Sequence, residues 1–257
     1  NALDELFRLL FIKQCNALNE ILPALFEKTN DYTELLLNLS VVDQDGVVYH
    51  LIHDIDEDDF NIEKGGQVEI IGWLYQYYNT ELNELVYDGS MSRSKVSKEL
   101  LPAATTIYTP DWAVRYMVQN SLGRLFIDKR KNEGVFADGC GLDEMTWDEV
   151  EEKRIAAEKH LAEQMEWKYY LPEAVQTKEV REQLDKIQQQ SEYKDVRDIK
   201  VIDPCMGSGH ILAYAFDVLM QMYEDAGYNQ RDAAKSILEN NLYGLDIDDR
   251  AYQLAYF

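Results

Sequence analysis

Apolar side chains recur every three or four residues along much of the N-terminal half of the chain, which is the spacing of amphipathic helices. This spacing predicts a helix over residues 3–26, with Pro23 marking a bend or a new helix start, and a short helix over residues 32–39. Residues 68–79 are rich in aromatic side chains at the same spacing and predict another helix. We therefore expect residues 1–104 to form a mainly helical region.

Two features interrupt this helical pattern. Asp45-Gly46 stands between two pairs of valines and predicts a hairpin-like connection or a turn within residues 41–52. Residues 54–59 are acidic, with aspartates alternating as they do in a calcium-binding loop. Asp59, however, occupies the position at which an EF-hand loop needs glycine. We expect a solvated loop there and predict no metal site.

A helix start is indicated just beyond this region. Thr109 suits the N-cap, Pro110 the first helical position, and Asp111 the positive end of the helix dipole. Apolar residues at helical spacing continue the helix over residues 112–122, and Gly123 is expected to end it.

The middle of the chain is charged and only weakly periodic. Residues 128–142 are loop-like, whereas residues 146–167 and 177–190 are rich in glutamate and glutamine and predict helices. We interpret these helices as solvent-exposed parts of an insertion at about residues 128–195.

The C-terminal part has a different pattern, that of two strands joined by helices. Residues 199–202 form an apolar run, residues 203–210 (DPCMGSGH) a glycine-containing turn, and residues 241–248 (NLYGLDID) a second strand that ends in acid. Two amphipathic helices, over residues 211–223 and 231–239, lie between the strands. This order predicts a parallel pair of strands with a helical crossover.

The residues around these strand ends suit a nucleoside-containing cofactor. Gly207 and Gly209 lack a Cβ atom, so the backbone can turn sharply and approach a ligand closely. Asp203 can accept a hydrogen bond from a ligand amine, and the amides that open the following helix can donate. Asp246 is placed to hold two ribose hydroxyls, and Ile247 to lie against an adenine ring.

The spacing favours S-adenosylmethionine over a nicotinamide dinucleotide. A dinucleotide-binding fingerprint requires a third small residue at the position where this chain has Leu212. It also requires an acidic residue about twenty positions further on, and this chain has no acid there. Asp246 comes much later, after two helices. An NAD-dependent oxidoreductase and a parallel βαβ unit whose glycines are purely structural remain the alternatives.

Composition limits the partners. The 257 residues carry a formal net charge of −23, from 25 basic and 48 acidic side chains. This charge repels a phosphate backbone, so contacts with DNA need a local patch or residues outside the chain.

The cysteines and the apolar stretches bear on where the protein is found. The three cysteines are widely separated, which argues against a disulfide framework and favours the reducing cytoplasm as the protein's location. No stretch is apolar for long enough to cross a bilayer, and we expect no membrane partner.

The motifs resemble those of a known family. Residues 203–210 resemble motif I of the amino-directed adenine-N6 DNA methyltransferases, residues 242–248 resemble motif II, and Tyr108-Thr109-Pro110 resembles motif X. More specific similarity, from about residue 68 onward, is to the PglX family of BREX phage-defence methyltransferases. The phrases that carry it are EIIGWLYQYY (69–78), SLGRL (121–125), YYLPEA (169–174) and LENNLYGLD (238–246).

The resemblance implies a fold, a cofactor and site residues. The implied fold class is α/β, in which the helical region is followed by the first part of a Rossmann-like S-adenosylmethionine-dependent methyltransferase sheet in residues 105–257. The implied cofactor-binding residues are Asp203, Pro204, Gly207 and Gly209 on the methionine side, Asp246 at the ribose, Ile247 at the adenine, and Thr109 and Pro110 closing the pocket.

The implied reaction is methyl transfer to adenine N6 in a short DNA site, on a base flipped into a polar-Pro-Pro-aromatic loop. The five prolines of this chain are all isolated, so the loop is absent from it, and no catalytic residue is assigned. We interpret the chain as a cofactor-binding piece of such an enzyme that is inactive alone, with DNA and other phage-defence proteins as partners. The alternative is a non-catalytic docking platform for defence proteins or a phage inhibitor.

Overall fold

The computed structural model describes residues 2–23, 25–26, 28, 40–61, 64, 70–87, 96–107, 109–133 and 144–257. The chain divides into two compact units. The first unit consists of residues 1–108, 207–209 and 246–257, and the second unit of residues 109–206 and 210–245.

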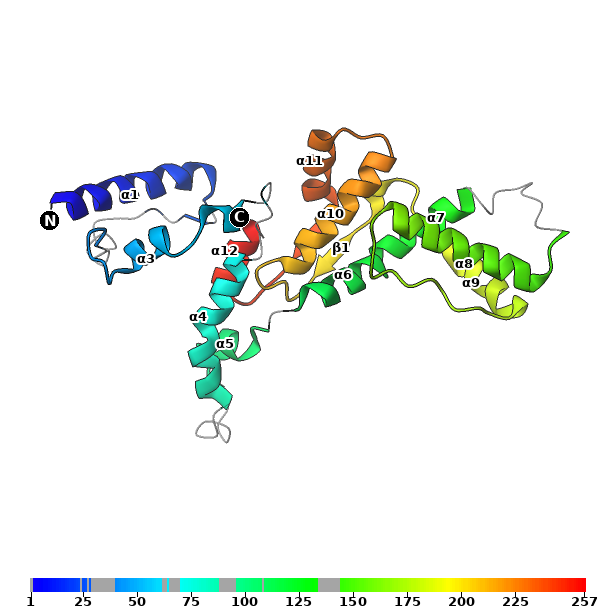
Figure 1. Ribbon diagram of the computed structural model, residues 1–257, viewed down its shortest axis with the longest axis horizontal. Helices are drawn as coiled ribbons and strands as arrows, with labels where there is room; N and C mark the ends of the chain where they lie inside the picture. The colour runs from blue at the N-terminus through cyan, green and yellow to red at the C-terminus, as the bar shows by residue number, and fades with distance from the viewer. Residues whose placement is uncertain are drawn as a thin grey trace. The chain divides into compact units, whose positions relative to one another are not determined.

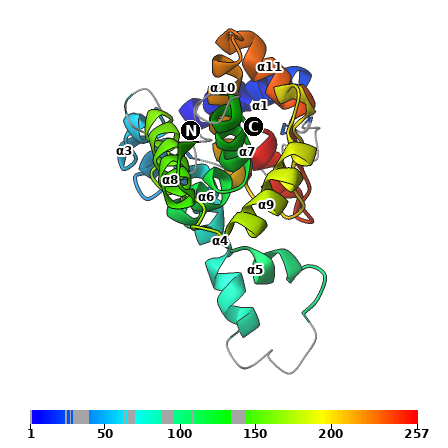
Figure 2. The ribbon, with the colours of Figure 1, turned by 90° about the vertical axis from the view of Figure 1, so that its right-hand side faces the viewer.

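The described part of the first unit is helical (Figures 1 and 2). Its elements are α1 (Ala2–Ile21), α3 (Val47–His53), the 3₁₀ turn η1 (Glu57–Phe60), α4 (Ile70–Tyr87), α5 (Leu101–Thr105) and α12 (Asp249–Tyr256). Helix α4 packs against α5 and, near its other end, against α12. The helix predicted over residues 3–26 is confirmed only as far as Ile21, where α1 ends. The helix predicted over residues 68–79 is confirmed by α4, which runs eight residues further. Residues 32–39 lie outside the described residues.

The turn expected at Asp45-Gly46 is confirmed, but it does not connect two strands of a hairpin. The backbone N–H groups of Asp45 and Gly46 both donate to Asp43, to Oδ1 at 3.1 Å and to the carbonyl at 3.0 Å. Gly46 then serves as the N-cap of α3, and its carbonyl accepts from the N–H of His50 at 3.2 Å. The turn signal was therefore real, but it opens a helix because the residues after it continue in α-helical hydrogen bonding.

The second unit contains seven helical segments and two strands in its described part. They are α6 (Asp111–Gln119), α7 (Leu122–Glu133), α8 (Trp147–Gln164), α9 (Lys178–Ser191), η4 (Val196–Asp198), β1 (Val201–Asp203), α10 (His210–Asp225), α11 (Gln230–Asn240) and β2 (Leu242–Gly244). The strands are parallel, with Ile202 opposite Tyr243, and α10 and α11 form the crossover between them. The parallel pair and its two-helix crossover are confirmed.

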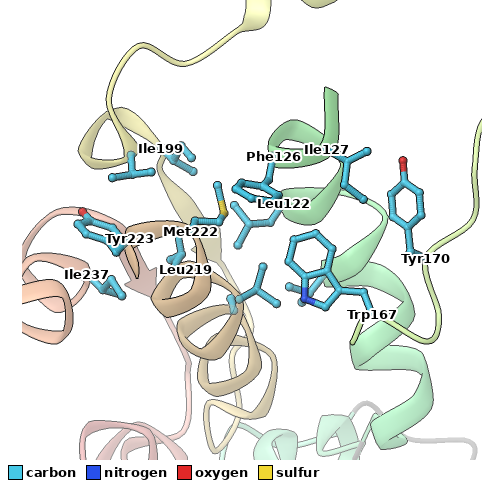
Figure 3. Close-up of a cluster of buried hydrophobic side chains, with 14 of the residues drawn as sticks. Leu122, Phe126, Ile127, Trp167, Tyr170, Ile199, Leu219, Met222, Tyr223 and Ile237 are labelled. Atoms are coloured by element: carbon cyan, nitrogen blue, oxygen red, sulfur yellow. The ribbon is translucent and has the colours of Figure 1, made fainter. Parts of the chain in front are cut away.

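Helix α10 lies at the centre of the hydrophobic core of this unit (Figure 3). Leu219, Met222 and Tyr223 of α10 are at most 1% exposed and contact neighbours from α7, α11 and the segment before β1. Burying each such large side chain stabilises the fold by about 1.5–3 kcal/mol. The neighbours labelled in Figure 3 are Leu122, Phe126, Ile127, Trp167, Tyr170, Ile199 and Ile237.

Gly123 does not end a helix, contrary to the sequence expectation. Helix α6 ends at Gln119, and Gly123 lies in the first turn of α7. A Cβ atom at Gly123 would lie 2.9 Å from Cζ3 of Trp167. The glycine is therefore explained by close packing of Trp167 on α7. The same helix extends to Glu133, so residues 128–133 are not the loop that was expected, and residues 134–143 lie outside the described residues.

Helix α8 is not the solvent-exposed helix that its charges suggested. The Glu158 side chain is fully buried and accepts from Lys131 Nζ at 3.2 Å and from Arg154 Nη1 at 2.6 Å. The Tyr170 hydroxyl and the Glu173 backbone N–H donate to its second oxygen, at 3.2 and 3.0 Å. These partners come from α7, α8 and the extended segment after α8, so the charged residues form a buried network that joins three segments.

Candidate cofactor site

The last residue of β1, Asp203, has a carboxylate whose hydrogen bonds are only partly satisfied. Asp203 is 8% exposed, and its Oδ1 accepts from the backbone N–H of Cys205 at 3.0 Å. Its Oδ2 is buried and has no hydrogen-bond partner among the described residues. Pro204 and Cys205 are exposed. Since a buried, unpaired carboxylate oxygen is costly, Asp203 is suited to receive a donor from a ligand.

The two glycines of this loop both have positive φ, 56° at Gly207 and 85° at Gly209, which explains why glycine stands at each. A Cβ atom on Gly207 would meet nothing within 4 Å, so its backbone borders open space. A Cβ atom on Gly209 would lie 3.0 Å from Cβ of Ala255 in α12. Gly207 thus leaves room for a ligand, whereas Gly209 allows close packing within the first unit.

The structure brings together Gly207 and Asp246, which belong to the two sequence motifs. The Gly207 backbone N–H donates to Oδ2 of Asp246 at 2.8 Å, and the Asp248 backbone N–H donates to Oδ1 at 2.8 Å. Both oxygens are thereby oriented by the main chain. A carboxylate offers about four lone-pair sites, so Asp246 retains capacity for two further donors. Ile247, next to it, is 67% exposed and offers an open apolar surface.

Asp246, Ile247 and Asp248 form an acidic loop, and sequence reasoning missed the residues that hold it in place. Asp248 is 9% exposed. Its Oδ1 accepts from the Arg250 backbone N–H at 3.1 Å and thereby caps α12. Its Oδ2 accepts from the Tyr75 hydroxyl. Burial raises the pKa of Tyr75, and the bond to Asp248 raises this pKa further. An aspartate before a helix is a readable cap signal. The sequence contained no signal for Tyr75, because 173 residues separate it from Asp248.

The helix start at residues 109–111 differs by one residue from the prediction. Pro110, with φ −57° and ψ 142°, is the N-cap residue, and no side chain caps α6, so Thr109 does not have the capping role expected of it. The Pro110 carbonyl accepts from the N–H groups of Ala113 at 2.9 Å and Val114 at 3.1 Å. The extended ψ of Pro110 moves the first helical residue to Asp111. Thr109 is half-buried and Pro110 exposed.

Helix α6 contacts helix α10. Thr109 and Pro110 come directly before α6, and the glycine loop (residues 207–209) comes directly before α10. Asp111 Oδ1 lies 3.8 Å from Nε2 of His210, the first residue of α10. One turn further along α6, the Arg115 guanidinium lies over the Tyr214 ring, 4.7 Å from its centroid. The Tyr214 hydroxyl accepts from Nε2 of Gln119 at 2.6 Å. These contacts bring the start of α6 and the start of α10 together within the second unit.

Leu212, which departs from the dinucleotide pattern, packs on a glycine of the next strand. A Cβ atom on Gly244 would lie 2.1 Å from Sδ of Met206 and 2.8 Å from Cδ1 of Leu212. In the dinucleotide pattern the small residue belongs to the helix. Here the strand supplies it, and close packing between α10 and β2 is retained with a large residue on the helix.

The remaining features of the described residues do not add a second site. A cavity of about 330 Å³ lies at the C-terminal end of α8 and contains none of the sequence-predicted site residues; its lining is Lys159, Ala162, Glu163, Glu166, Trp167, Lys168, Tyr170 and Pro172. In the part of the chain that the structure describes, no group of three or more His, Cys, Asp or Glu residues is arranged to hold a metal ion. No helix there is both long and apolar enough to cross a membrane.

Known proteins similar to this chain are adenine-specific methyltransferases. The chain is 46% identical over 256 residues to the adenine-specific methyltransferase PglX of Lacticaseibacillus casei (strain Zhang). It is 40% identical over 254 residues to the adenine-specific methyltransferase BrxX of Escherichia coli O9:H4 (strain HS). Each match covers 99% of this chain, but only 19% of PglX and 18% of BrxX. The resemblance to the PglX family is thereby confirmed, and it extends over nearly the whole chain instead of starting at about residue 68.

A more distant similarity is to another protein named as a methyltransferase. The chain is 29% identical over 156 residues, 58% of its length, to a putative type II restriction enzyme and methyltransferase of Methanocaldococcus jannaschii, of which the match covers 11%. No protein-family model matches the chain. The chain spans about one fifth of the length of its PglX and BrxX relatives.

Proposed function

We propose that this chain carries the S-adenosylmethionine-binding part of a DNA methyltransferase that modifies adenine N6, within a Rossmann-like fold. The observation that carries the proposal is the hydrogen bond from the Gly207 N–H to Asp246, which ties the glycine loop to the acidic end of the second strand. Similarity to PglX and BrxX supports the reaction class. Host DNA marking in phage defence is part of the proposal, on the motif resemblance.

The residues present fit this cofactor. Asp203 has a buried oxygen that no described residue hydrogen-bonds, and this oxygen is suited to the cofactor's amine. Gly207 borders open space, and the oriented carboxylate of Asp246 can accept from two ribose hydroxyls. Exposed Ile247 offers an apolar surface to an adenine ring. Pro204, Gly209, Thr109 and Pro110 complete the proposed binding set.

The chemistry proposed for this chain is binding and orientation. When bound, S-adenosylmethionine supplies a methyl group on a sulfonium. Asp203 fixes the amine end, Asp246 fixes the ribose, and together they set the direction in which the methyl group faces. We propose no acid, base or nucleophile in this chain. The five prolines are isolated, so a Pro-Pro loop that receives the flipped adenine must be supplied by other residues.

Contacts with DNA are likewise assigned to residues outside this chain. The net charge of −23 opposes a phosphate backbone, and a methyltransferase that flips a base needs positive charge along its DNA contact. Other phage-defence proteins are proposed as partners on the family resemblance alone.

Calorimetric titration of the protein at its full natural length tests the cofactor site. S-adenosylmethionine and S-adenosylhomocysteine should both bind, and Asp246→Ala should weaken binding by more than about tenfold, because two charge-assisted hydrogen bonds are lost. Asp249→Ala is the matched control, since Asp249 is an exposed acid three residues away, and it should change affinity by less than about twofold.

Three results would contradict the proposal. They are no binding of either compound by the parent protein, equal effects of Asp246→Ala and Asp249→Ala, and displacement of S-adenosylhomocysteine by NAD at comparable concentration. The reaction itself is tested by incubating the same protein with DNA and labelled S-adenosylmethionine and digesting the product. Label is expected in N6-methyladenine and in no other nucleoside.

A further inference from the structure

A continuous chain of hydrogen bonds runs from helix α4 to the glycine loop. The Tyr75 hydroxyl of α4 donates to Oδ2 of Asp248. The Asp248 N–H donates to Oδ1 of Asp246 at 2.8 Å, and the Gly207 N–H donates to Oδ2 of Asp246 at 2.8 Å. All four residues belong to the first unit, so helix α4 of the N-terminal region reaches the acidic loop directly.

We propose that Tyr75 is a positioning residue, which sets the affinity for the cofactor's ribose by holding the Asp246–Asp248 loop. The inference rests on the proposed function, because it takes Asp246 as the group that receives the ribose hydroxyls. Tyr75 itself is assigned no contact with the cofactor.

The loop needs such a support because its second acid is buried. Asp248 is 9% exposed, and an oxygen of a buried carboxylate that lacks a hydrogen bond is energetically costly. The Arg250 N–H satisfies only Oδ1, so the Tyr75 hydroxyl supplies the donor for Oδ2. Without that hydroxyl, the Asp248 side chain must rotate or draw in water. The peptide N–H of Asp248, which orients Asp246, moves with it.

A neighbouring aromatic contact strengthens the case that α4 holds the loop. The rings of Tyr75 and Tyr78 are stacked, with centroids 6.3 Å apart and planes at 17°. The Arg250 guanidinium lies over the Tyr78 ring, 5.8 Å from its centroid. One face of α4 therefore contacts the loop at Asp248 and the first turn of α12 at Arg250. Tyr77, between these two tyrosines, is 76% exposed.

The test compares Tyr75→Phe with Tyr77→Phe in the protein at its full natural length. Both substitutions remove one hydroxyl and keep the ring, but only the first removes a bond to the loop. We expect Tyr75→Phe to weaken the binding of S-adenosylhomocysteine about three- to tenfold, which corresponds to the loss of one hydrogen bond. Tyr77→Phe should leave the affinity unchanged, and both variants should keep the Tm of the parent within about 4 °C.

Two further measurements separate positioning from a general structural effect. An S-adenosylhomocysteine analogue that lacks both ribose hydroxyls should bind Tyr75→Phe and parent within about twofold. In an Asp246→Asn background, Tyr75→Phe should have no additional effect on S-adenosylhomocysteine, because the two residues act through one chain of bonds. If Tyr75→Phe fails to fold, Asp248→Ser replaces it. Serine can still cap α12 but lacks the second oxygen, which accepts from Tyr75, so the same selective loss is expected.

The outcomes distinguish this proposal from the function on which it rests. If the parent protein does not bind S-adenosylhomocysteine, the proposed function fails and the role of Tyr75 fails with it. If the parent binds, the role of Tyr75 alone is overturned by equal affinities of Tyr75→Phe and Tyr77→Phe. An equal loss for the analogue without hydroxyls, or additive effects with Asp246→Asn, overturns it as well.

Discussion

The backbone N–H of Gly207 lies 2.8 Å from Oδ2 of Asp246, although 39 residues separate them in sequence. Gly207 donates its amide N–H from a backbone conformation with φ 56°, which residues other than glycine seldom adopt. The bond therefore depends on two chemical requirements, a residue without Cβ in the loop and a carboxylate after the second strand. Each requirement can be tested by substitution.

Gly207→Ala should weaken cofactor binding, with Gly227→Ala as the matched control. Both glycines have positive φ, 56° and 87°, and a Cβ atom on either would meet nothing within 4 Å. Each substitution should therefore destabilise the protein by about 1–2 kcal/mol through backbone strain alone. Only Gly207→Ala should also lower the affinity for S-adenosylhomocysteine, measured by calorimetry. Equal affinities of the two variants would contradict a role for the Gly207 loop.

Local signals were sufficient to predict the elements that form this site. The alternation of an apolar run, a glycine loop and an amphipathic helix led to β1 and α10, and the acid after the next apolar run led to Asp246. The helical spacing likewise predicted α1 and α4. These features depend on residues close together in sequence, so backbone propensity and periodicity determine them.

The features that sequence reasoning missed depend on residues far apart in the chain. Gly123 was interpreted as a helix end because its packing partner, Trp167, comes 44 positions later. Helix α8 was expected to be exposed because Glu158 looks solvated without Lys131 and Tyr170 beside it. Such assignments need the tertiary contacts, since a charged or small residue has the same local pattern in either setting.

Gly244→Ala should destabilise the second unit by about 1–3 kcal/mol, because the added methyl overlaps Met206 and Leu212. Met206→Ala removes the nearer of these atoms, Sδ at 2.1 Å. The cost of Gly244→Ala should therefore be smaller in the Met206→Ala background than in the parent. Urea denaturation of the parent, the two single variants and the double variant measures this difference. Additive effects would mean that Gly244 is not in contact with Met206.

Glu158→Gln should be strongly destabilising, whereas Glu152→Gln should not. The substitution leaves Lys131 and Arg154 buried beside a neutral group, and removal of one partner from a buried ion pair costs about 3–5 kcal/mol. Glu152 is an exposed acid on the same helix, and its replacement should change stability by less than about 0.5 kcal/mol. The shift in the urea midpoint checks both values. A shift of similar size in the two variants would show that the buried network contributes little.

The same network should make the protein less stable in acid. Burial by itself raises the pKa of Glu158, but Lys131, the Glu173 N–H and Arg154 together bring it below its ordinary value. The pKa of Glu151 is lowered in the same way, against the effect of burial, by Arg154 and the Gln176 N–H. A lowered pKa in the folded state means that the unfolded state takes up protons first. The stability is therefore fully present above about pH 4.3, the unfolded value, and is lost as the pH falls through the lower folded value.

Asp128 acts in the opposite sense, because burial raises its pKa, so the parent's pH curve alone does not isolate Glu158. The prediction concerns the difference between the parent and Glu158→Gln. Urea midpoints of the two proteins, measured from pH 7 down to about pH 3, should converge as the pH falls below the ordinary glutamate pKa. A constant separation over this range would mean that Glu158 contributes by its shape and hydrogen bonds, and that its charge adds nothing to the stability of the fold.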